Sequence, residues 1–153
     1  MILLGLRCSN SDFSYAVLEG SKKRPVLREK NVVLFPKNYS RLDSLRWFFL
    51  EIDGLIKRVK PEGILIKKSE ILARKSKSRD ERVGNETIVL LVAALNNIKY
   101  VDCRVKSTIA KNLGYKGKGH YLKTAFDNSS LEDYANEGEK IREAILVAWS
   151  GLK

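Results

Sequence analysis

The fold is decided by residues 40–66, SRLDSLRWFFLEIDGLIKRVKPEGILI, where a helical pattern gives way to a short apolar run. Apolar side chains recur at every third or fourth position over 42–59, which predicts an amphipathic helix that Ser40 begins and Pro61 ends. Residues 63–66 do not alternate, as expected of a strand that helices bury on both faces. A helix followed directly by such a strand is typical of an α/β sheet.

Three strands are expected before this helix. The apolar runs 2–8 and 13–18 are separated by turn-forming residues and predict a β-hairpin. The apolar runs 26–27 and 32–35 predict a third strand, which Pro36 ends. These three strands should pair antiparallel because short turns connect them.

The rest of the chain predicts alternating helices and one more strand. The expected elements are a helix at about 86–96, a strand at 98–103, helices near 105–113 and 120–126, and a last helix with a capping box at Ser129 and Glu132. Each late strand follows a helix, so right-handed crossovers should lay both strands parallel to the first. The predicted fold class is α/β, with a five-stranded mixed sheet in the order 3-2-1-4-5.

Length and composition indicate one globular domain over residues 1–153, with 44% hydrophobic and 31% charged residues. We expect a cytoplasmic protein that does not enter a membrane, because no apolar run is long enough to span one. Cys8 and Cys103 should be reduced thiols, about 10 Å apart in this sheet order, and with His120 they are too few for a zinc site. The net charge of +11 favours a polyanionic partner.

Four segments together carry a resemblance to a known family. They are an opening hairpin at 5–17 (GLRCSNSDFSYAV), an apolar strand with its flanks at 61–68, a helix start at 104–109 and a closing helix at 140–148. With the predicted element order, these segments resemble the ribonuclease H-like fold, and within it the RuvC-type Holliday junction resolvases. The resemblance implies a nuclease whose carboxylates hold two divalent cations.

The family's catalytic acids fall on Arg7, on Lys67 (or Lys68 if the register slips by one), on Lys140 and on Glu143. Three of these four residues are cations, which reverse the local field and cannot ligate Mg²⁺ or Mn²⁺. We therefore expect a site without catalysis and without a cofactor.

Other acids leave an alternative open. Glu70, Asp133 and Glu143 are the candidates for a rearranged Mg²⁺ or Mn²⁺ site, which would make the protein a structure-selective nuclease. The competing interpretation places the acids before the closing helix at its solvated N-terminal end, where negative charge is favourable; they are Glu132, Asp133, Glu137 and Glu139.

Basic residues gather in two segments. Residues 67–82 hold seven basic residues against three acidic ones, and 104–123 hold six basic residues and no acid. The second segment interleaves tyrosines and lysines with glycine at 115–121, a mixture suited to phosphates and stacked bases. The expected nucleic-acid-binding residues are Arg7, Lys67, Lys68, Arg74, Lys75, Lys77, Lys116, Lys118, His120, Tyr121 and Lys140.

The sequence thus predicts a non-catalytic protein that binds DNA or RNA in the groove of a lost nuclease site. Besides the nuclease, a pseudo-nuclease that docks on an acidic protein remains an alternative. The cluster Trp47, Phe48 and Phe49 exceeds one helix face; core packing is the favoured interpretation, and a small homodimer interface is the alternative.

Overall fold

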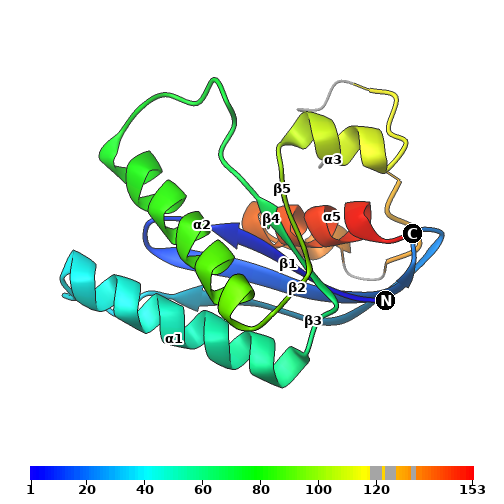
Figure 1. Cartoon of the computed structure of the whole chain (residues 1–153). Coiled ribbons are helices and arrows are strands. Elements are labelled where there is room, and N and C mark those ends of the chain that lie inside the picture. Colours follow the sequence, from blue (N-terminus) through cyan, green and yellow to red (C-terminus); the bar gives the residue numbers. More distant parts are fainter. Residues whose placement is uncertain (118–121, 123–126, 132–133) are drawn as a thin grey trace.

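The computed structural model describes residues 1–117, 122, 127–131 and 134–153. Its centre is a five-stranded mixed sheet in the order β3-β2-β1-β4-β5 (Figure 1). β1 pairs antiparallel with β2 and parallel with β4, and β4 pairs parallel with β5. The strands are β1 (Ile2–Cys8), β2 (Asp12–Ser21), β3 (Arg24–Leu34), β4 (Gly63–Lys67) and β5 (Tyr100–Arg104). The predicted α/β class and strand order are confirmed.

Helices cover both faces of the sheet (Figure 1). The helices are α1 (Arg41–Val59), α2 (Lys77–Leu95), α3 (Lys106–Asn112), a 3-10 turn at Tyr134–Asn136 and α5 (Glu139–Gly151). α1 and α2 pack on one face, and α5 and α3 pack on the other. No helix in the described part of the chain is both long and apolar enough to cross a bilayer.

Alternation along the strands divides the interior into two cores. Leu4 and Ile64 belong to the core under α1 and α2, whereas Leu3 and Leu65 belong to the core under α5. Because side chains alternate with a period of two, Arg7 and Lys67 share the α5 face with Leu3 and Leu65. The two cations at the strand ends therefore project toward α5.

Gly5 allows α5 to lie directly on β1. A Cβ atom at this position would be 2.2 Å from the carbonyl oxygen of Ala144 and 2.8 Å from the Cβ atom of Ala148. Only glycine leaves room for so close an approach of helix and strand. The contact places the first turns of α5 beside the carboxyl end of β1, where the candidate site lies.

Two helix predictions need correction. α2 begins at Lys77, well before the expected residue 86, and the Ser76 hydroxyl accepts a hydrogen bond from the Arg79 N–H. Its first turns lack an apolar stripe, so periodicity could not reveal them. The last helix begins at Glu139 with Gly138 as its N-cap, so the capping box at Ser129 and Glu132 is wrong. Glu132 and most of the helix expected at 120–126 lie outside the described residues.

The remaining differences are small. β3 begins two residues before the first apolar run that predicted it, and β5 extends to Arg104, with its start two residues later than expected. The α1 prediction is confirmed, and the Ser40 hydroxyl caps the helix as expected. Both cysteines are free thiols, Cys8 buried and Cys103 partly buried.

Candidate nucleic-acid interface

The site lies where the ends of β1 and β4 meet the first turns of α5. Leu6 and Ile66 are paired in the parallel register of these strands. Arg7 and Lys67 come one residue later and share a face of the sheet. Residues 140 and 143 are three apart in α5 and so lie on one face of that helix. The four positions that the sequence singled out are thus brought together.

Arg7 forms a buried ion pair with Glu143. The Arg7 Nε donates to Glu143 Oε2 at 2.9 Å, and Nη1 donates to the carbonyl oxygen of Cys8 at 2.8 Å. The two side chains are only 16% and 6% exposed. A pair this far from water needs a close partner for each charge, and here each supplies the other.

Lys67 lies inside the molecule, with only 2% of its surface exposed. Its Nζ donates to Glu70 Oε1 and to the Lys68 carbonyl oxygen, both at 2.7 Å. Burial lowers the pKa of Lys67 below its ordinary value, although the carboxylates of Glu70 and Glu143 oppose this shift. The sequence predicted that Lys67 contacts nucleic acid. In this conformation its ammonium is buried and is not accessible to a phosphate at the surface.

Glu70 reaches back to the strand ends from the loop after β4. Burial alone would raise its pKa, but hydrogen bonds from Lys67 and from the backbone N–H of Lys106 lower it overall. The carboxylate therefore stays ionised at neutral pH and balances the buried ammonium. Its approach to Lys67 also ties the start of α3 to the end of β4.

Lys140, like Arg7 and Lys67, is a cation paired with one carboxylate. Its Nζ lies 2.5 Å from Asp12 Oδ2, and the lysine side chain is 40% exposed. We call Arg7, Lys67 and Lys140 the floor cations. Each floor cation is held by one carboxylate, from Glu143, Glu70 and Asp12 respectively.

These residues do not fit a pair of divalent cations. A two-metal site needs several carboxylates that share the ions, whereas Glu143 and Glu70 are each committed to a cation. Within the described residues, no group of three or more acidic, histidine or cysteine side chains could hold a metal ion. Asp133, the third acid of the nuclease alternative, lies outside the described residues.

A second basic region follows β4 along the chain and lines a hollow together with Arg7; it comprises residues 68–82, which we call the rim segment. Arg74, Lys75 and Lys77 are exposed there, and Lys68 is half-buried. Lys116 is exposed in the loop after α3. Lys118, His120 and Tyr121, the other residues expected in that loop, lie outside the described residues.

A hollow of about 230 Å³, which no sequence motif indicated, lies between Arg7 of the floor and the rim segment. Its lining includes Arg7, Arg74, Arg79, Arg82, Ser69 and Ser78, and we call it the arginine pocket. Arg82 is fixed by Glu86 Oε1 at 2.8 Å and by the Lys67 carbonyl oxygen at 2.9 Å. The sequence had indicated Arg7 and Arg74 as nucleic-acid-binding residues, and the spacing of Arg82 and Glu86, four residues apart, was a further signal for the pocket.

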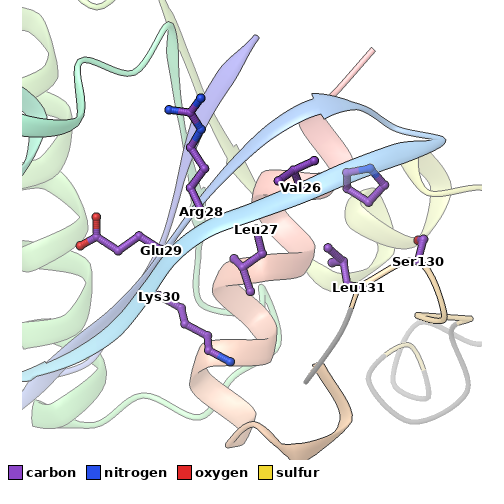
Figure 2. Close-up of a pocket in the computed structure, with 8 residues that line it drawn as sticks. Val26, Leu27, Arg28, Glu29, Lys30, Ser130 and Leu131 are labelled. Atoms are coloured by element: carbon purple, nitrogen blue, oxygen red, sulfur yellow. The ribbon is translucent and has the colours of Figure 1, made fainter.

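A hollow of about 630 Å³ along β3 has a different character (Figure 2). Its charged lining residues are all paired: Arg28 with Glu19, Glu29 with Arg58, and Lys30 with Glu137. Figure 2 shows its walls coming from β3 and from the segment of Ser130 and Leu131. Because every one of these charges already has a partner, this hollow offers nothing specific to a polyanion.

Comparison with known proteins finds no matching family model and no curated relative. Solved structures do match. Thermus thermophilus RuvC in complex with a Holliday junction substrate has a TM-score of 0.77 at 13% identity, covering 98% of this chain and 91% of that one.

Two further resolvases share the architecture. The yeast mitochondrial Holliday junction resolvase Ydc2 has a TM-score of 0.65 at 14% identity, covering 97% of this chain and 76% of that one. The fowlpox virus resolvase in complex with Holliday junction DNA has a TM-score of 0.51 at 12% identity, covering 98% and 95%. The chain therefore has the RuvC-like form of the ribonuclease H-like fold.

Proposed function

We propose that this protein is a single-domain, non-catalytic, RuvC-like nucleic-acid-binding protein of the cytoplasm. The observation that carries the proposal is the set of floor cations, Arg7, Lys67 and Lys140, each paired with a carboxylate. They stand where the resemblance implies metal-binding acids. The fold of DNA-binding resolvases and the net charge of +11 support nucleic acid as the partner.

Binding would rest mainly on phosphate contacts. The exposed cations of the rim segment and of the loop after α3 can meet a phosphate backbone; they include Arg74, Lys75, Lys116 and Lys77, whose Nζ lies 4.0 Å from Glu81 Oε1. Phosphate contacts release counterions and carry little sequence information. We therefore expect salt-sensitive binding with weak preference among base sequences.

Loss of catalysis follows from the electrostatics of the floor. A divalent cation placed beside Arg7 and Lys67 would meet two positive charges, and the nearest carboxylates already neutralise those charges. We propose accordingly that the protein uses no cofactor. The alternative, a Mg²⁺- or Mn²⁺-dependent nuclease, would require Glu70 and Glu143 to leave Lys67 and Arg7.

The deciding experiment titrates the protein with four-way junction, duplex and single-stranded DNA and RNA at two salt concentrations, with and without Mn²⁺. Salt-sensitive binding without cleavage is the expected result. Cleavage that Glu143→Gln abolishes would overturn the non-catalytic assignment. Absence of binding to every nucleic acid at low salt would favour the protein-interaction alternative, with an acidic protein as partner.

The contribution of the loop after α3 is tested separately. Charge reversal by Lys116→Glu with Lys118→Glu should flatten the dependence of the binding constant on salt, because each phosphate that is no longer neutralised reduces that slope by about 0.9 on duplex DNA. An unchanged slope would remove this loop from the proposed interface.

A homodimer remains part of the proposal. α2 exposes Leu90, Leu91 and Leu95 on its surface, and Trp47 of α1 is only partly covered. Light scattering coupled to size-exclusion chromatography would measure the mass directly. A mass near 17.4 kDa at all concentrations would rule the dimer out.

A further inference from the structure

We propose that the arginine pocket binds a phosphate group of a nucleic-acid strand, with Arg74 and Arg79 as the two residues that hold it. This inference rests on the proposed function and gives it a specific contact. It concerns residues beyond the floor, since three of the pocket's four arginines belong to the rim segment.

The arginine pocket holds positive charge that no described acidic side chain balances. Arg7 and Arg82 are neutralised by Glu143 and Glu86, at 2.9 and 2.8 Å. Arg74 and Arg79 have no ion-pair partner among the described residues, and no acidic side chain is part of the described lining. Two uncompensated guanidinium groups therefore face one small hollow, which is the charge pattern that suits a phosphate.

Arg79 also holds a hydrogen-bond donor that the pocket could use. Its Nε is buried and has no hydrogen-bond partner within the described part of the chain. A buried N–H without an acceptor is costly, and such groups in native structures usually find a partner in water, an ion or a ligand. A phosphate oxygen in the pocket would accept from this donor.

The walls of the pocket are fixed before any ligand arrives. Arg82 donates to the Lys67 carbonyl oxygen, Arg7 donates to that of Cys8, and the buried Asn85 amide donates to that of Ser9 at 2.8 Å. The Arg82 and Asn85 bonds join α2 to the end of β4 and to the turn between β1 and β2, and the Arg7 bond fixes the guanidinium against its own strand. Binding to a preformed pocket avoids the entropy cost of ordering its walls.

The first turn of α2 adds a favourable field. α2 has nineteen residues and begins at Lys77, so its positive dipole end lies beside Ser78 and Arg79 of the pocket. This field supports the guanidinium contacts and does not define the site alone. The exposed Lys75 and Lys77 belong to the same segment but do not line the pocket, which makes them suitable controls.

The test compares two double variants with equal loss of charge. Arg74→Gln/Arg79→Gln removes the proposed contacts, and Lys75→Gln/Lys77→Gln removes two cations from the same segment outside the pocket. Because Arg74 and Arg79 lack described ion pairs, the first variant should fold normally, which its thermal unfolding would verify. We expect its affinity for a short single-stranded oligonucleotide to fall about tenfold more than that of the lysine variant.

A direct readout is the Nε–H signal of Arg79 in a nitrogen-15 spectrum of arginine side chains, identified as the signal that Arg79→Lys removes. Oligonucleotides with and without a 5′-phosphate, and inorganic phosphate, are the three probes. A shift with both oligonucleotides assigns the pocket to internal phosphates, and a shift with the 5′-phosphorylated one alone assigns it to a strand end. Either result supports the proposal.

Three outcomes would overturn it. If the oligonucleotide binds but the Arg79 signal does not move, or if the two double variants lose equal affinity, the pocket does not hold the phosphate and the proposed function still stands. If only inorganic phosphate shifts the signal, the pocket binds an anion unrelated to nucleic acid. If neither oligonucleotide binds at low salt, the proposed function fails as well.

Discussion

The floor and the rim segment are both rich in cations, yet their charges are used differently. Each floor cation has a carboxylate within 3 Å, and Lys67 and Glu143 are buried. In the rim segment, Arg74 and Arg79 have no ion-pair partner among the described residues, and Lys75 is exposed. The floor is a nearly neutral network, whereas the rim segment holds charge that is free to attract a polyanion.

This difference teaches that counting basic residues overstates what a groove can bind. Charges buried in a low-dielectric interior must be paired locally, and once paired they contribute little field beyond a few ångströms. The floor cations Arg7 and Lys67 therefore join the ends of β1 and β4 to the carboxylates around them. Affinity for a phosphate backbone should come from the rim segment and the loops beside it.

The largest expected effect comes from returning acids to the floor. In Arg7→Asp/Lys67→Glu/Lys140→Asp, six carboxylates would crowd one site, including the former partners Glu143, Glu70 and Asp12. Without metal we expect a loss of about 5 kcal/mol or more in the free energy of unfolding, because the buried charges repel. Mn²⁺ at about 100 times its dissociation constant should restore about 2.7 kcal/mol.

Thermal unfolding with Mn²⁺ and with a chelator would measure this effect. The wild-type protein is the control, and its melting temperature should be the same in both conditions. If the variant melts at the same temperature with and without Mn²⁺, the floor positions are not placed to share a metal, and the resemblance to a two-metal site fails at these residues.

Removing one carboxylate from the floor should cause the next largest loss in the free energy of unfolding. Glu143→Gln leaves the Arg7 guanidinium buried with a neutral partner, which should cost about 3 kcal/mol of stability. The matched control is Glu19→Gln, which breaks the more exposed pair with Arg28 and should cost less than about 0.5 kcal/mol. Urea unfolding of both variants measures the two losses in the free energy of unfolding. Similar losses would mean that the Arg7–Glu143 pair contributes no more to stability than an exposed pair.

The sequence predicted those parts of the fold whose signals are local. The helix over residues 41–59 carries its own cap at Ser40 and a full apolar stripe, so both of its ends could be predicted. The first turns of α2 could not, because residues 77–82 are polar on every side and give no periodicity. The start of α5 was misplaced because Ser129 and Glu132 imitate a capping box, while the real N-cap is a glycine without a capping side chain.

The site was predictable in position but not in detail. The resemblance placed Arg7, Lys67, Lys140 and Glu143 at one edge of the sheet, and the structure brings them together there. It could not show that Arg7 pairs with Glu143, which is 136 residues away, because that contact depends on how closely α5 approaches Gly5. Nor does a run of charges reveal that Arg79 turns its Nε inward, since only tertiary packing decides this.

The salt dependence of nucleic-acid binding should also distinguish the rim segment from the floor, with a smaller expected effect. Lys75→Gln/Lys77→Gln should reduce the slope of the logarithm of the binding constant against the logarithm of salt concentration, by about 0.9 for each phosphate of duplex DNA that is no longer neutralised. Lys67→Met should leave this slope unchanged, because the buried ammonium touches no phosphate. A reduced slope for Lys67→Met would show that the floor opens on binding, and the division between the two regions would then be wrong.

The smallest effect concerns the protonation of Lys67. Its pKa is lowered by burial, so between that lowered value and the ordinary 10.5 the unfolded chain binds more protons than the folded one. Stability contributed by this residue must therefore rise with pH in that interval, as an unfavourable buried charge is lost. The carboxylates of Glu70 and Glu143 face Lys67 and raise its pKa, the Arg82 guanidinium lowers it, and burial outweighs the two carboxylates.

Subtracting the stability of Lys67→Met from that of the wild-type protein isolates this contribution, because Tyr15, Cys8 and the other alkaline groups titrate in both proteins. The difference should move in favour of the wild-type protein as the pH rises from neutral toward 10.5. A rim control, Lys75→Met, should show no such trend, since Lys75 is exposed to solvent and Lys67 is buried. If the stability difference between the wild-type protein and Lys67→Met does not change with pH, the Lys67 ammonium is fully solvated by water or by Glu70. The floor would then not differ from the rim segment in the burial of its charge.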